Sequence, residues 1–148
     1  MTARTAFLAA NIGAITKDSW TAYPTPVAAV AAGMYIQCVN SSTGQTIQNP
    51  AKLMIVAVIG STATTVTLRA SGNGNNAAGV AQVSPVPSST IFAQSTLGDL
   101  VSASTTSGTI AVSFSTDRFL QPDGNIYLDF SQVTGVTVYA WQRPFNAV

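Results

Sequence analysis

Histidine and glutamate are absent from this chain of 148 residues, and Cys38 is its single cysteine. Without histidine, the chain cannot form a Ser-His-Asp or Cys-His nucleophile or a histidine-based metal site. One cysteine forms no disulfide within the chain and cannot hold zinc by itself. Neither lysine follows a glycine, as the lysine of a phosphate-binding loop does. We therefore predict that the protein is not an enzyme, with no catalytic residue, no cofactor and no metal.

Charge is also scarce. Charged residues make up 7% of the chain, with six lysines and arginines against five aspartates, whereas ordinary soluble domains hold about a quarter. The basic residues are scattered, so they offer no patch that neutralises a run of phosphates, and we predict no nucleic-acid binding. The longest strongly apolar run, residues 53–60, is far shorter than the roughly 20 residues of a membrane-spanning helix, and we predict no membrane insertion. A surface with so little charge resists association weakly, which favours a homo-oligomer or a partner-bound protein over a monomer with a polar, uncharged surface.

What the chain does contain is short runs of alternating apolar and polar residues, bounded by Gly, Pro, Asn and Ser. Alternation with a period of two is typical of a strand with one buried face, and turn residues recur at the spacing expected of a sandwich or barrel. Residues 52–59 are apolar on both faces, which predicts a central, covered strand. The predicted fold is all-β, an antiparallel β-sandwich or barrel-like single domain. The predicted strands are residues 34–39, 52–59, 65–70, 98–104, 109–114, 125–130 and 136–143.

Two regions fall outside this strand pattern. Residues 1–32 are predicted as an N-terminal arm or edge segment, ahead of a β-sandwich domain at residues 33–148. Residues 71–90 form a loop longer than the roughly 12 to 15 residues beyond which loops tend to be functional or disordered; we favour a loop ordered by a partner, with disorder as the alternative. We expect these regions to contact a partner through Arg4, Phe7, Lys17, Trp20, Tyr23, Asn73, Asn75 and Asn76.

The sequence RFLQPDGNIYLDF, residues 118–130, gathers three charged residues around a glycine. A calcium loop needs further oxygen ligands at alternate positions, whereas apolar residues separate the two aspartates here. Pro-Asp-Gly is instead a turn sequence, because glycine tolerates positive φ and aspartate bonds its own downstream backbone. We predict a structural hairpin with Asp123 and Gly124 in its turn and an ion pair between Arg118 and Asp129 across it.

Three aromatic residues, Tyr127, Tyr139 and Trp141, fall on the faces opposite the aliphatic rows of their strands. Such rings can form a stacking platform for sugars, which makes a carbohydrate-binding module one candidate. The alternative, which we favour, is that the N-terminal arm or a neighbouring subunit covers these rings.

The second half of the chain carries a resemblance to a known family. Its segments are Thr65 to Gly72 within KLMIVAVIGSTATTVTLRASGNG, Gly98 to Leu100 within LGDLVSAS, Arg118 to Phe130, and Arg143-Pro144. In this order they resemble small capsid decoration (cement) proteins of tailed double-stranded DNA phages, especially the actinobacteriophage type. The resemblance covers residues 33–146. The 71–90 loop, which is longer than that family's turn, and the N-terminal 32 residues depart from it.

The resemblance implies a structural virion protein with a β-sandwich or barrel-like domain that binds the outer surface of the phage head. It implies the major capsid protein as partner, and homotrimers that link neighbouring capsid subunits and stabilise the shell. We expect removal of residues 1–17 to abolish head binding and to leave the fold intact. Two alternatives stay open: a tail- or fibre-associated virion domain, and the carbohydrate-binding module.

Overall fold

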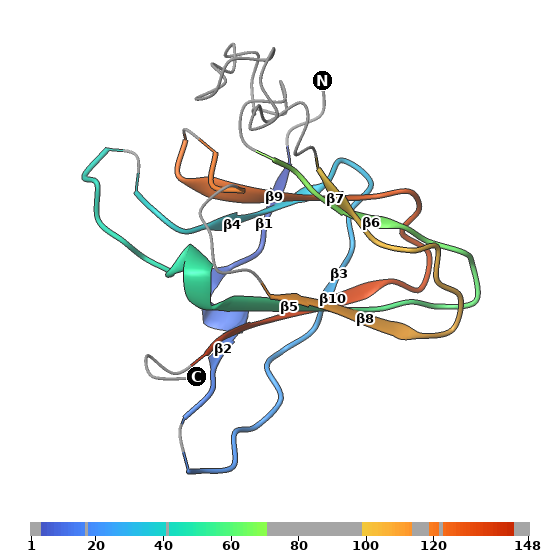
Figure 1. Ribbon diagram of the computed structural model, residues 1–148, viewed down its shortest axis with the longest axis horizontal. Helices are drawn as coiled ribbons and strands as arrows, with labels where there is room; N and C mark the ends of the chain where they lie inside the picture. The colour runs from blue at the N-terminus through green and yellow to red at the C-terminus, as the bar shows by residue number, and fades with distance from the viewer. Residues whose placement is uncertain are drawn as a thin grey trace, which may run out of the picture.

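The computed structural model describes residues 4–16, 18–40, 42–70, 99–113, 119–121 and 123–143. Regular structure in this part of the chain is almost entirely β, apart from two short 3-10 helices, η1 at Ala9–Asn11 and η2 at Pro50–Lys52. Two sheets pack face to face and enclose the core between them (Figure 1). The predicted all-β sandwich is confirmed.

The first sheet, called sheet A below, is built from five strands. These are β1 Thr5–Ala6, β4 Met34–Gln37, β6 Val66–Leu68, β7 Leu100–Val101 and β9 Asn125–Phe130. Their order in the sheet is β1-β4-β9-β6-β7. The long strand β9 lies at the centre, antiparallel to both β4 and β6, and β7 closes one edge.

The second sheet, called sheet B, packs across the core from sheet A. Its strands are β2 Ile12–Ala14, β3 Val27–Ala28, β5 Leu53–Val58, β8 Thr109–Ser113 and β10 Thr137–Gln142. The order is β2-β10-β5-β8, and β3 also pairs with β10. Strand β5 has a partner on each side and is buried along most of its length, so the predicted central, covered strand at 52–59 is confirmed.

The sheets are mixed rather than purely antiparallel, which corrects the predicted arrangement. The two parallel pairs are β1 with β4 and β2 with β10. Both involve N-terminal strands, which add to an edge of each sheet. The short 3-10 helix η1 carries the chain from sheet A at β1 to sheet B at β2. The N-terminal segment therefore contributes an edge strand to each of the two sheets.

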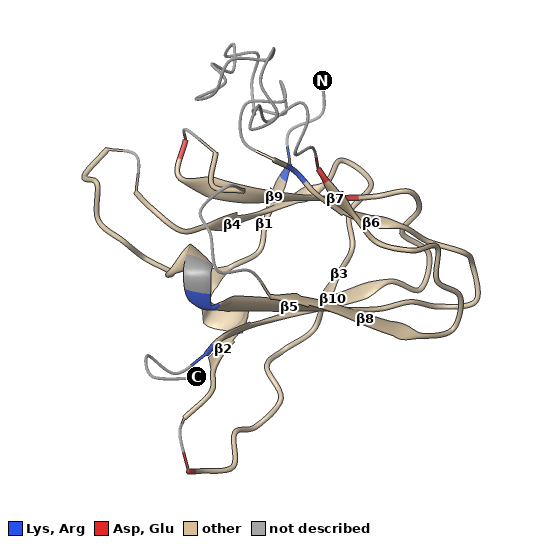
Figure 2. Ribbon diagram, in the orientation of Figure 1, with Lys and Arg blue, Asp and Glu red and all other residues tan. Residues whose placement is uncertain are grey.

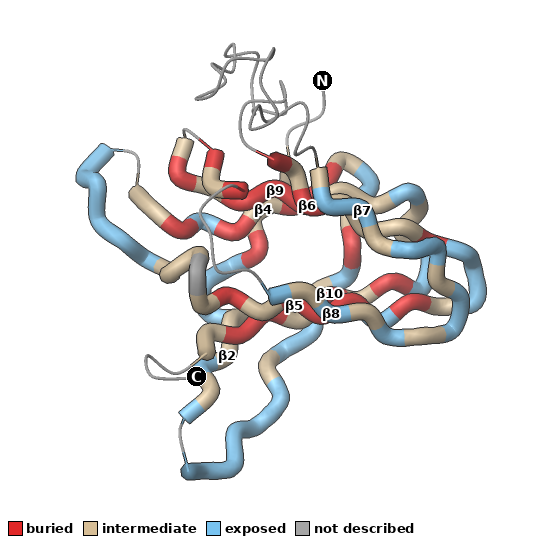
Figure 3. The backbone as a smooth tube through the Cα atoms, in the orientation of Figure 1, coloured by how far each residue is buried: buried red, intermediate tan, exposed pale blue. Residues whose placement is uncertain are grey.

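The core lies between the two sheets and takes side chains from both. Figure 3 shows buried residues along the strands of each sheet. Along β9, Ile126 and Leu128 are buried in this cluster, and along β10, Val138 and Ala140 are. The predicted inward faces of β9 and β10 are therefore confirmed at these positions, although Tyr127 and Trp141 on the opposite faces are buried as well. Other members of the same cluster are Phe7, Met34, Ile36, Cys38, Leu53, Ile55, Leu68, Ala70 and Phe119.

Candidate functional site

The Asp-Gly sequence forms the tight turn that was predicted. The amide of Gly124 donates to the carbonyl of Gln121 at 2.9 Å, and the amide of Gln121 donates to the carbonyl of Asn125 at 2.8 Å. Gly124 has a φ of +83°, and a Cβ at this position would collide with the carbonyl of Val39. Only glycine meets both conditions without strain.

Asp123 has a structural task in this turn. Its carboxylate accepts hydrogen bonds from the backbone amide of Asn125 at 3.1 Å, from the side-chain amide of Asn125 at 3.0 Å, and from the hydroxyl of Tyr127. The ring of Tyr127 is wholly buried, and the Arg4 guanidinium lies 4.5 Å from its centroid. The turn thus locks a buried tyrosine in place.

Asp129 is the centre of an ion-pair network on the outer face of sheet A (Figure 2). Arg4 donates to both of its carboxylate oxygens, and Arg69 Nε donates to Oδ2 at 2.5 Å. Arg69 Nη1 also donates to Asp99 Oδ2 at 2.6 Å, while Asp99 Oδ1 accepts the Ala70 amide at 2.7 Å. The network ties the N-terminal segment to β9, to the end of β6 and to the start of β7.

This network differs from the predicted pair of Arg118 with Asp129. Arg118 lies outside the described residues, and Asp129 is held by Arg4 and Arg69. The register explains the role of Arg69: Thr67 on β6 stands opposite Asp129 on β9, and Arg69 follows two residues later on the same face. The sequence held one indication of this role: Arg69 lies on the polar face of a predicted strand, in a chain with very few charged residues.

The ionisation of both central groups follows from these contacts. Burial alone would raise the pKa of Asp129, but hydrogen bonds and charge attraction from Arg4 and Arg69 outweigh it and lower the pKa below its ordinary value. Burial alone would lower the pKa of Arg69, but its bonds to Asp99 and Asp129 raise the pKa above the ordinary value. Both groups are therefore charged at neutral pH, in the role of a structural clamp.

Gly33 makes room for this clamp. It has a φ of +85°, and a Cβ there would collide with the Arg4 guanidinium and the Asp129 carboxylate. The Gly33 carbonyl also accepts the amide of Thr5 at 3.0 Å at the start of β1. A glycine with no motif around it in the sequence therefore allows the N-terminal strand to dock.

The three aromatic residues of the predicted sugar platform do not lie together. Tyr127 belongs to β9 of sheet A, whereas Tyr139 and Trp141 belong to β10 of sheet B. The expectation of one platform from these three rings is therefore wrong. Strand alternation placed each ring on an outer face, but the assignment of strands to sheets needed the tertiary structure.

Tyr139 and Trp141 are covered in part by the N-terminal segment, as the favoured alternative predicted. Their rings stack with centroids 6.0 Å apart, and Tyr23 meets them edge-on at 5.2 and 4.9 Å. Gly13 on β2 lies opposite Trp141, and a Cβ there would approach the indole ring to 2.8 Å. The absence of a side chain at Gly13 lets the indole lie across β2.

Residues 15–26 connect β2 to β3 and project away from sheet B (Figure 1). The amide of Ile15 donates to the Gln142 carbonyl at 2.9 Å at one end of this loop, and Tyr23 packs on the β10 rings near the other. Trp20 lies between these two anchors and is fully exposed, with a relative accessibility of 102%. We call residues 15–26 the Trp20 loop.

The predicted partner-contact residues separate into four groups. Trp20 and Tyr23 are exposed, the latter by 72%. Phe7 is only 3% exposed and belongs to the core, so its predicted role as a contact residue is wrong, because β1 places it between the sheets. Arg4 is engaged by Asp129. Outside the described residues lie Lys17, Asn73, Asn75 and Asn76.

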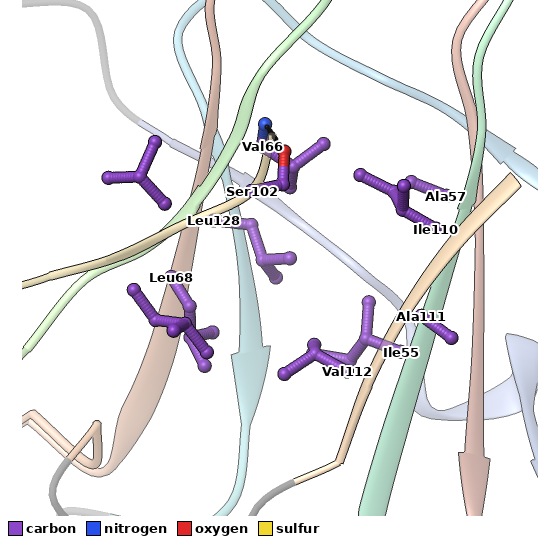
Figure 4. Close-up of a pocket in the computed structure, with 11 residues that line it drawn as sticks. Ile55, Ala57, Val66, Leu68, Ser102, Ile110, Ala111, Val112 and Leu128 are labelled. Carbon is purple, nitrogen blue, oxygen red and sulfur yellow. Dashed lines mark hydrogen bonds between the residues drawn. The ribbon is translucent and has the colours of Figure 1, made fainter. Parts of the chain in front are cut away.

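An apolar pocket of about 200 Å³ opens between the two sheets at the edge formed by β7 and β8 (Figure 4). From sheet A it is lined by Leu68, Leu100 and Leu128, and from sheet B by Ile55 and Ile110, among others. Leu100 and Val101 at its mouth are exposed by 43% and 56%. In the part of the chain that the structure describes, the single polar side chain in the lining is that of Ser102.

Groups suited to chemistry or metal binding are few. The Cys38 thiol is fully buried, and burial raises its pKa to about 12, so it is an unreactive core side chain. Within residues 4–143, where described, no three of His, Cys, Asp and Glu gather as metal ligands do. No helix in the same residues is long and apolar enough to cross a membrane.

Comparison with protein-family models, with curated proteins and with solved structures gave no match for this chain.

Proposed function

We propose that this protein is a structural virion protein that binds the outer surface of a phage head and stabilises the shell by linking neighbouring subunits of the major capsid protein. The observation that supports this most directly is a pair of exposed apolar surfaces at opposite edges of one sandwich. The Trp20 loop lies beside β2 and β3 at one edge of sheet B, and the pocket lies beside β8 at the other. A protein that links capsid subunits, either directly or through copies of itself, needs at least two contact surfaces, and this arrangement supplies them.

The properties of both surfaces suit binding to protein. Exposed tryptophan and tyrosine are the side chains most often found at the energetic centres of interfaces. Tyr23 and the Ile15 backbone hold the Trp20 loop against β10, so binding immobilises little additional chain. The resemblance of residues 33–146 to capsid decoration proteins supports the same function.

The stabilising mechanism is thermodynamic linkage. A protein that binds the assembled shell but not the separated subunits lowers the free energy of the shell by an amount that grows with its concentration. Each contact can be weak, because icosahedral symmetry repeats it over the whole head. The protein would act as copies that associate with one another, a homotrimer in the form that the resemblance implies, and it would need no cofactor.

The first experiment is to count this chain in purified particles by quantitative mass spectrometry, relative to the major capsid protein. A ratio near one, together with heads that break at lower temperature when the gene is deleted, is the expected result. A handful of copies per particle would overturn the capsid proposal in favour of the tail- or fibre-associated domain.

Absence of the chain from the particle would overturn any virion role and would favour the hypothesis of a carbohydrate-binding module. A polysaccharide pull-down is the direct assay for that hypothesis. Tyr139 and Trp141 would be the rings to replace in that assay, since they stack on the outer face of sheet B.

A further inference from the structure

We infer that two copies of this chain bind each other by insertion of Trp20 from one copy into the apolar pocket between β7 and β8 of the next. Trp20 is a fully exposed residue of the Trp20 loop, and the pocket is an apolar opening about 200 Å³ in volume. The inference deepens the proposed function, because it names a second copy as one of the partners that the protein links.

The volume of the pocket suits the indole ring of Trp20. A protein cavity of about 150 Å³ lined by aliphatic and aromatic side chains binds benzene, so one of about 200 Å³ suits a larger, bicyclic ring. Burial of an aromatic side chain removes roughly 150 to 250 Å² of its surface from water, which is a large contribution for one residue.

The pocket also offers a hydrogen-bond acceptor for the indole N–H of Trp20. A buried indole N–H needs an acceptor, and Ser102 supplies the one polar side chain among the described residues of the pocket lining. Ser102 Oγ accepts the Val66 amide at 2.9 Å and donates to the Ala103 carbonyl at 2.9 Å. A hydroxyl has two acceptor lone pairs, so one of them is left for the indole. None of the described residues that line the pocket is charged, so docking desolvates no charge among them.

The geometry makes this contact intermolecular. In sheet B, β10 and β5 separate the β2 and β3 edge from β8, and the Trp20 loop projects away from the sandwich in Figure 1. Tyr23 holds the loop against β10, far from the pocket of the same chain. The contact is therefore head-to-tail: each copy offers one Trp20 and one pocket, and copies joined this way close into a ring or extend as a chain.

Two single variants and their mixture test the inference, with the purified protein and no capsid present. Trp20→Ala removes the inserted ring from an exposed position, and Leu100→Asp places a carboxylate at the mouth of the pocket. In sedimentation velocity the wild type should associate with rising concentration, and each variant alone should stay monomeric, with association weakened by more than about 30-fold as for an interface hot spot. Mixed together, the two variants should form a one-to-one complex and nothing larger, since one supplies the pocket and the other the tryptophan.

Leu8→Asp is the matched control, because Leu8 is an exposed leucine that lies outside both surfaces. It should associate like the wild type. Ile110→Asp, on the sheet B side of the pocket, repeats the test if Leu100→Asp lowers the melting temperature. Trp20→Phe should give intermediate association, since it keeps a ring and loses the N–H.

Three outcomes would overturn the inference: a wild type that stays monomeric at every concentration, a Trp20→Ala variant that associates like the wild type, or a mixture of the two variants that stays monomeric. None of these depends on the particle count. A protein that is abundant on heads but monomeric in solution would support the proposed function and contradict this inference. A protein that associates through Trp20 but is absent from heads would support this inference and contradict the proposed function.

Discussion

Asp129 shows how a single residue can hold distant parts of this chain together. Its carboxylate joins Arg4, which is 125 positions away, and Arg69, which is 60 positions away. The three side chains are 15 to 31% exposed, so solvent screens their attraction in part, and exposed pairs contribute little. These ion pairs stabilise the fold mainly through the hydrogen bonds that Arg4 and Arg69 donate to Asp129.

Replacing Asp129 by asparagine should lower the free energy of unfolding by about 1 to 3 kcal/mol, because Arg4 and Arg69 would then lose a charged acceptor in a partly buried site. Urea denaturation measures this as a lower midpoint with an unchanged slope. Asp18→Asn is the control, since Asp18 is exposed and its positive φ of 57° also suits asparagine. Equal midpoints for the two variants would contradict the clamp.

The same carboxylate predicts a pH dependence. The folded state lowers the pKa of Asp129 below the unfolded value of about 3.9. Its contribution to stability is therefore present above pH about 4 and is lost as the pH falls through the folded pKa. The wild type should lose stability below pH about 4 more steeply than Asp129→Asn, as followed by denaturation midpoints in a pH series. Parallel curves for the two proteins would exclude Asp129 as the source.

Cys38 should be unreactive in the folded protein. Burial raises its pKa to about 12, compared with about 8.5 in an unfolded chain, so almost no thiolate is present at pH 8. A thiol reagent such as dithionitrobenzoate should label it only at the rate of unfolding, and at once in denaturant. The neutral thiol makes its full contribution to the free energy of unfolding below pH about 8.5, and this contribution declines as the pH rises toward 12. Rapid labelling of the native protein would contradict the burial.

At the scale of elements, the N-terminal segment takes the second of the two predicted forms, an edge segment rather than a free arm. Strand β1 pairs with β4, β2 pairs with β10, and Phe7 between them enters the core. Removal of residues 1–17 should therefore damage the fold, in contrast to the expectation that such a truncation leaves it intact. Loss of head binding by that truncation would no longer identify a contact surface.

Phe7→Ala isolates this effect in one side chain. The change leaves a cavity in a well-packed core, and such changes cost about 3 to 5 kcal/mol. Thermal unfolding followed by circular dichroism should show a large drop in melting temperature. Leu8→Ala, at the exposed neighbouring position, should unfold like the wild type. A melting temperature for Phe7→Ala equal to that of the control would show that β1 does not dock as described.

The Trp20 loop shows a further limit of prediction at this scale. Trp20 and Tyr23 were both expected to contact a partner, yet they have different environments. Tyr23 packs edge-on against two rings of β10, whereas Trp20 is fully exposed. No local pattern distinguishes them, because the difference depends on a strand more than a hundred residues later in the chain.

The low charge of the whole molecule predicts how its associations respond to salt. Raising the ionic strength from about 0.01 M to 1 M shortens the Debye length from roughly 30 Å to 3 Å and weakens interactions between exposed charges. Only 7% of the residues are charged, and both apolar surfaces bind without ion pairs in the proposals above. Attachment to heads, measured by cosedimentation, should therefore persist at 1 M sodium chloride. Release by moderate salt would indicate an electrostatic contact instead.

The sequence by itself determined the strands from β4 to β10, the inward faces of the long strands among them, and the turn at Asp123 and Gly124, but not the short strands β1, β2 and β3. Each depends on local physics: alternation with a period of two separates the faces of a strand, and glycine alone adopts a positive φ against a neighbouring carbonyl without strain. Strand β5 was identified as central for a similar reason, since only a covered strand is apolar on both faces.

Tertiary structure alone decided which strands share a sheet and which side chains meet. The separation of Tyr127 from Tyr139 and Trp141, the capture of Asp129 by Arg4 and Arg69, and the burial of Phe7 all follow from strand order and from two parallel pairings. These pairings join residues far apart in the chain, so neither composition nor spacing encodes them locally. The pocket at the β7 and β8 edge exists for the same reason, because it is bounded by the last strand of each sheet.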